Sequence, residues 1–139
     1  MPLVTLPARH RPIAGYLGAF YLVMAGINIG LVVADRTIYR PLADDGLFAF
    51  VRSGWRDIVM AEPGLWIGLL AAGEIAIGLA FLSRDAWPRA AYIAAIAFHV
   101  ALMLFGWGFW LWSAPALAGL IWAGRHDGVF GTRAATPAE

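Results

Sequence analysis

Four long apolar stretches, almost free of charge, alternate with short charged or glycine-rich segments along the chain. They cover residues 13–33, 64–82, 90–105 and 109–123. A helix rises about 1.5 Å per residue and the hydrocarbon core of a bilayer is about 30 Å thick, so about 20 apolar residues can cross it. The pattern therefore predicts an all-α integral membrane protein, with residues 1–139 forming one four-helix transmembrane bundle.

The connection between the first two stretches, residues 34–63, holds much of the charge and has a helical pattern of its own. Apolar residues recur there at helical spacing, and charged residues fall on the opposite face. Asp44 or Asp45 can cap the start of such a helix. We therefore expect an amphipathic interfacial helix over about residues 45–60, which serves either as a surface brace or as a lid over a cavity.

Small residues indicate where the spanning helices approach one another. Gly26 and Gly30 form a GxxxG motif that permits close backbone approach, and Asn28 between them is expected to hydrogen-bond across that contact. In the second stretch an i+4 series of small residues predicts a packing face: Gly68, Ala72, Ala76 and Ala80.

Composition supports a membrane protein and excludes several kinds of site. The chain is 61% hydrophobic and 14% charged, whereas a soluble domain has roughly 25% charged residues. Its net charge of +1 gives no basic surface for nucleic acid. The absence of cysteine excludes disulfides, thiolate metal sites and iron–sulfur clusters, and no other set of metal ligands can be assembled.

Arginine placement predicts the orientation. The N-terminal flank, the 84–89 turn and the C-terminal tail hold two arginines each, whereas residues 34–63 hold four. Since arginine is enriched in cytoplasmic segments, both termini are expected on the cytoplasmic side of the cell inner (plasma) membrane. The 106–108 corner has no arginine, and residues 131–139 are expected to be a disordered tail.

Glu74 is the one residue among Asp, Glu, Lys and Arg within the four apolar stretches. A charge at such a depth normally faces protein or a wet cavity rather than lipid. Counted from the helix ends at ~1.5 Å per residue, Glu74 and Tyr21 lie ~12 Å deep and His99 ~13.5 Å, with Ser113 at a similar level. The candidates for binding a ligand or a proton are therefore Glu74, His99, Tyr21, Ser113 and Asn28.

Helices joined by a short turn are antiparallel neighbours, so Glu74 and His99 could meet directly. Such a pair can share one proton, pass a proton to a ligand, or hydrogen-bond the carbonyl of a quinone-like molecule. The alternative is that it only locks two helices together. No complete nucleophile–base set accompanies it, so the sequence leaves open whether the protein is an enzyme.

The run Ala72-Gly-Glu-Ile-Ala-Ile-Gly-Leu-Ala-Phe-Leu82 and the Arg/Trp/Pro turn after it resemble the DoxX-like membrane proteins. The closing Ala123-Gly-Arg-His-Asp127 is similar to the end of that family, so the resemblance covers about residues 64–128. It implies a four-helix membrane protein, and Glu74 matches a family position of functional weight. Some relatives are small subunits of quinone-linked enzymes such as thiosulfate–quinone oxidoreductase.

These features favour an accessory or quinone-contacting subunit of a larger oxidoreductase or respiratory-type membrane complex. Its partners would be the lipid bilayer and other membrane subunits or a second copy of the chain, and quinone is the cofactor that it would contact. The alternative hypothesis is a dimeric proton-coupled carrier of small hydrophobic compounds, with Glu74 as the proton-binding group.

Overall fold

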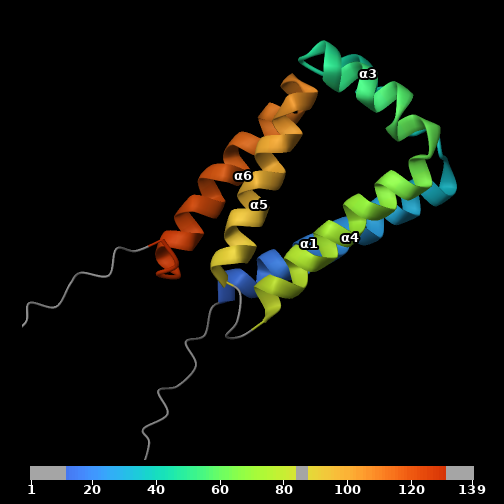
Figure 1. The fold of residues 1–139 in the computed structure, drawn as a ribbon. Helices are drawn as coiled ribbons and strands as arrows, with labels where there is room; N and C mark the ends of the chain where they lie inside the picture. The colour runs from blue at the N-terminus through green and yellow to red at the C-terminus, as the bar shows by residue number, and fades with distance from the viewer. Residues whose placement is uncertain (1–11, 84–87, 131–139) are drawn as a thin grey trace, which may run out of the picture.

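The protein consists of two pairs of long helices that diverge from one end of the molecule (Figure 1). A computed structural model describes residues 12–83 and 88–130, and every regular element in these ranges is helical. In chain order the elements are α1 (Pro12–Ala34), α2 (Leu42–Asp45), α3 (Ala49–Asp57), η1 (Val59–Ala61), α4 (Pro63–Leu82), α5 (Pro88–Leu102), η2 (Met103–Phe105) and α6 (Trp107–His126).

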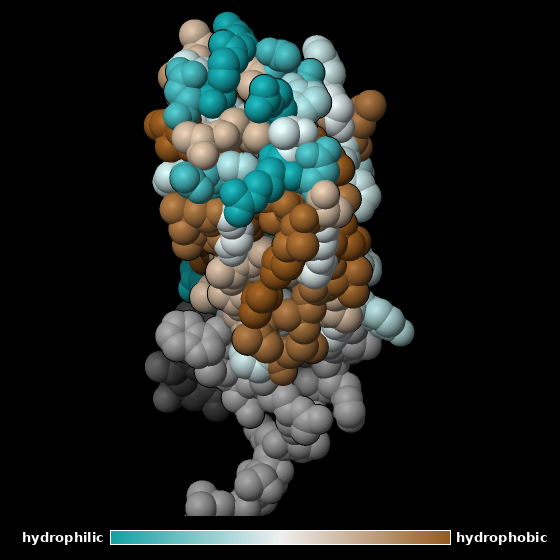
Figure 2. Space-filling model, turned by 90° about the vertical axis from the view of Figure 1, so that its right-hand side faces the viewer, coloured by the Kyte–Doolittle hydropathy of each residue, from teal (hydrophilic) through white to brown (hydrophobic). Residues whose placement is uncertain are grey.

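The expected all-helical class is confirmed, and three of these helical segments are long and apolar enough to cross a membrane. They are Ile13–Ala34, Pro63–Leu82 and Pro88–Phe105, the last of which joins α5 to η2. Figure 2 shows a broad hydrophobic surface below a largely hydrophilic end. The α6 helix has the same length as α4 but is not among the three.

The pairing of α1 with α4 is the most extensive helix contact in the described residues. The two backbones come close at Gly18 and Gly78, where a Cβ on Gly18 would lie 2.9 Å from the Gly78 carbonyl oxygen. The predicted GxxxG contact is wrong, because a Cβ on Gly26 or Gly30 would meet nothing within 4 Å.

The buried face of α4 also differs from the predicted one. Ala72 and Ala76, in the middle of the predicted small-residue series, are exposed. The face that is buried carries Ile67, Ala71, Glu74, Ile77, Gly78 and Phe81. Leu65, Leu69 and Leu79 on the other faces are exposed, since lipid covers large apolar side chains as well as protein does. The buried face is the one that carries Glu74, whose carboxylate is costly in lipid.

The predicted interfacial helix over residues 45–60 is divided into three short helices, α2, α3 and η1, which we call the cap. Gly46 and Phe48 adopt extended conformations between α2 and α3. The Leu47 amide there donates a hydrogen bond of 2.8 Å to the Leu104 carbonyl of η2. Glycine lowers helix stability, and this bond to another segment replaces a helical one. Asp44 and Asp45 therefore lie in α2 and do not cap α3.

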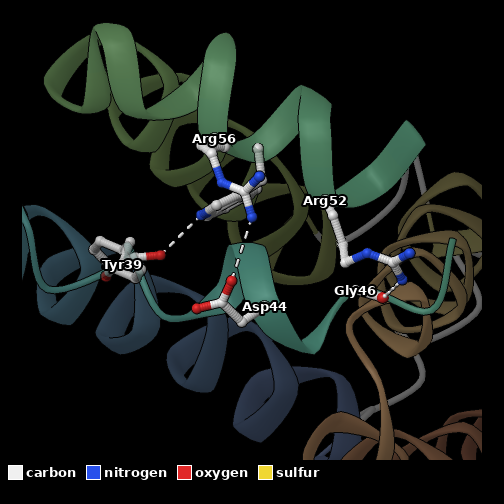
Figure 3. Close-up of polar contacts among 6 residues, drawn as sticks. Tyr39, Asp44, Gly46, Arg52 and Arg56 are labelled. Atoms are coloured by element: carbon white, nitrogen blue, oxygen red, sulfur yellow. Dashed lines mark hydrogen bonds and ion pairs between the residues drawn. The ribbon is translucent and has the colours of Figure 1, made fainter. Parts of the chain in front are cut away.

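Polar contacts hold the pieces of the cap together at the end where the two helix pairs are farthest apart (Figures 1 and 3). The Arg56 Nη2 atom lies 3.3 Å from Asp44 Oδ1, and Arg52 Nη1 donates a 2.8 Å hydrogen bond to the Gly46 carbonyl. At the predicted corner, Gly106 has a φ of 90°, and a Cβ there would lie 2.6 Å from the Asp45 carbonyl oxygen. Glycine is thus needed where α6 begins.

Two of the expected features lie outside the described residues. These are most of the 84–89 turn and the tail at residues 131–139.

Candidate functional site

Glu74 belongs to a buried hydrogen-bond chain that links α4 to α1 and to the segment before the cap. The Asn28 side-chain amide donates to both carboxylate oxygens of Glu74, at 3.0 and 2.8 Å. The Tyr39 hydroxyl in turn donates a 2.6 Å hydrogen bond to Asn28 Oδ1. Glu74 is 2% exposed and Asn28 9%, so the carboxylate is held at the α1–α4 interface and away from lipid.

This arrangement confirms that Asn28 hydrogen-bonds across a helix contact, and it identifies Glu74 as the acceptor. Amide donors reduce the free-energy cost of burying a carboxylate. The pKa of the Tyr39 hydroxyl is raised above its ordinary value, first by its own burial and then by the nearby Glu74 charge. Tyr39 therefore remains a hydrogen-bond donor at neutral pH.

The sequence leaves open whether Glu74 meets His99, and the structure does not pair them: Glu74 bonds to Asn28, and no hydrogen bond joins it to His99 in the described residues. The side chain of His99 lies instead among aromatic rings, with ring centroids 6.4 Å from Tyr21 and 5.7 Å from Phe98. The reason is geometric. Although α4 and α5 are consecutive, they diverge, and α4 packs mainly on α1 (Figure 1).

A cavity of about 450 Å³ lies between the two helix pairs and under the cap. Residues of α1, α4, α5, η2, α6 and the cap line it, and its lining is mainly apolar and aromatic: Phe20, Trp55, Phe98, Phe105, Phe109 and Trp112 are the aromatic residues other than Tyr39 and His99. Asn28, Tyr39 and His99 bring polar side chains to the wall, and no Asp, Glu, Lys or Arg is among the described lining residues. A volume and a lining of this kind are typical of small-molecule sites.

The cap contributes directly to this cavity. The Trp55 ring lies edge-on to Phe105 at 4.9 Å, and its Nε1 donates a 2.8 Å hydrogen bond to the Tyr39 carbonyl. Of the two roles expected for the amphipathic segment, cover of a cavity is the one that this geometry supports. The sequence does not indicate Tyr39 and Trp55 as site residues, because nothing in the 34–63 pattern distinguishes them from surface aromatics.

The other two sequence candidates lie near the cavity but do not line it. Tyr21 is 1% exposed and Ser113 0%, and neither hydroxyl has a hydrogen-bond partner in the described residues. A second hollow of about 530 Å³ beside Gly106 and Trp107 contains none of the candidates. Within residues 12–83 and 88–130, no group of three His, Asp or Glu side chains could hold a metal ion.

No protein-family model, curated protein or solved structure matches the chain. The resemblance to the DoxX-like proteins therefore stays a prediction.

Proposed function

We propose that the protein is a DoxX-like four-helix integral membrane protein in which α1, α4, α5 and α6 all cross the bilayer. The three apolar segments and the equal lengths of α6 and α4 support this proposal. The cap then lies at one membrane surface. The arginine distribution favours the cytoplasmic side of the inner membrane for both termini.

Within that membrane the protein serves as an accessory, quinone-contacting subunit of a larger oxidoreductase complex. The observation that carries this proposal is the uncharged, aromatic-lined cavity with His99 on its wall. A quinone ring is flat and apolar and has neutral carbonyl acceptors, so this lining suits it. The partners are other membrane subunits, which supply the redox chemistry.

The experiment is native mass spectrometry of the protein extracted gently from its own membrane. We expect oxidoreductase subunits to migrate with it, together with a bound quinone. A monomer that co-isolates with no other chain contradicts the subunit role. A parallel extraction in a harsher detergent, which separates subunits, is the control for specific association.

The geometry favours this role over the proton-coupled carrier. A carrier needs its carboxylate to exchange protons with the transport path. Glu74 is 2% exposed, is not among the residues that line the cavity, and has both oxygens bonded to Asn28.

A further inference from the structure

The hydrogen-bonding state of the cavity wall shows which group is left for a ligand. The Asn28 Nδ2 group donates to both carboxylate oxygens of Glu74, and Asn28 Oδ1 accepts a hydrogen bond from the Tyr39 hydroxyl. Asn28 thus uses its amide nitrogen and its oxygen in bonds within the protein, and the Tyr39 hydroxyl hydrogen is already donated. His99 is 3% exposed, lines the cavity and makes no hydrogen bond within the described part of the chain.

The two ring nitrogens of His99 are not equivalent. Nδ1 is enclosed by protein and has no hydrogen-bond partner, so Nε2 is the nitrogen left to meet the cavity. A neutral imidazole carries one N–H, and an enclosed donor without an acceptor is less tolerated than an enclosed acceptor. The environment therefore favours the tautomer with its hydrogen on Nε2, which presents a donor to the cavity.

We propose that the cavity binds an uncharged, membrane-soluble ring compound through a hydrogen bond from His99 Nε2–H to a carbonyl oxygen of the ligand. The inference rests on the proposed function and deepens it by assigning the ligand contact to His99 rather than to Glu74. A charged ligand is excluded because none of the described lining residues is an acid, lysine or arginine. The aromatic lining takes the ring faces.

The test compares two compounds of the same ring size in phosphatidylcholine nanodiscs. Menadione has carbonyl oxygens, whereas 2-methylnaphthalene has none. We expect His99→Phe to weaken menadione binding about tenfold, the effect of one lost hydrogen bond, and to leave 2-methylnaphthalene binding unchanged. His99→Gln keeps an N–H donor near the Nε2 position, so it should retain most of the menadione affinity and guards against an effect of misfolding.

His126→Phe is the matched control, because this side chain is 60% exposed outside the cavity and should not alter either affinity. The chain has three histidines, so the ¹⁵N resonance of His99 Nε2 can be followed directly. We expect menadione to shift it and 2-methylnaphthalene to leave it unchanged.

Equal weakening of both compounds by His99→Phe, or no weakening of menadione binding, overturns the proposal. So does an Nε2 resonance that menadione leaves unchanged. These outcomes are separate from the test of the subunit role. Selective, His99-dependent menadione binding by a chain that co-isolates with no subunit would support the ligand contact and remove the accessory role.

Discussion

At the scale of single residues, the pairing of Asn28 with Glu74 explains how this chain tolerates a carboxylate in the middle of an apolar helix. A buried carboxylate is costly unless donors compensate for lost water. Asn28 supplies those donors from α1, and Tyr39 orients the amide through its oxygen. Removal of one partner therefore costs more than removal of both, because it leaves the other buried and unpaired.

We accordingly expect Asn28→Leu to destabilise the protein by about 2–3 kcal/mol, since Glu74 would lose its donors. The double variant Asn28→Leu/Glu74→Leu should recover most of that loss, because no unpaired polar group remains between the two helices. Thermal unfolding in detergent, followed by tryptophan fluorescence, measures both. Additive losses in the double variant would show that the two side chains are not energetically coupled.

At the scale of helices, the face of α4 that packs is the one that carries Glu74, and small residues matter where two backbones come close. Gly18 and Gly78 lie at such a point, whereas the Gly26–Gly30 motif faces open space. A small-residue motif permits close approach but does not compel it, since helices in lipid associate through complementary packing and through hydrogen bonds such as that of Asn28 with Glu74.

Gly18→Ala is therefore expected to destabilise the protein by about 1–3 kcal/mol through overpacking. Its new Cβ would lie 2.7 Å from Leu82 Cγ. Gly26→Ala is the matched control in the same helix. It meets nothing within 4 Å and should leave stability unchanged or raise it by up to about 1 kcal/mol through helix propensity. Unfolding midpoints that fall in the reverse order would contradict the observed close approach.

At the scale of the whole molecule, the divergence of the two helix pairs creates the cavity, and the cap covers it. The α1–α4 and α5–α6 pairs are each packed along their length, while α4 and α5 separate toward the cap (Figure 1). The four long helices alternate in direction, so the start of α1 and the end of α6 lie at the end of the molecule opposite the cap (Figure 1). That arrangement predicts a topology that can be measured.

The native chain has no cysteine, so a single introduced cysteine shows on which side of the membrane its position lies. Ser53 in the cap and Arg125 near the end of α6 are both exposed. We expect a membrane-impermeant maleimide to label Ser53→Cys in intact cells and Arg125→Cys only after permeabilisation. Labelling of both from the same side would show that α4, α5 and α6 do not all cross the membrane.

The sequence by itself determined the all-helical class and most helix boundaries. Long apolar stretches must satisfy their backbone groups internally in a membrane, which leaves little choice but helices. Glu74, His99, Tyr21, Ser113 and Asn28 were recognisable as buried polar groups, because polar residues stand out in apolar stretches. All five are indeed buried in the structure.

Only the tertiary structure decided which of these groups meet. Periodicity along one helix does not give the angle between two helices, so the partner of Glu74 depended on the divergence of α4 from α5. The division of the cap depended on a backbone hydrogen bond between Leu47 and Leu104, far apart in the chain. The cavity and the free nitrogen of His99 follow from those long-range contacts, which no local pattern records.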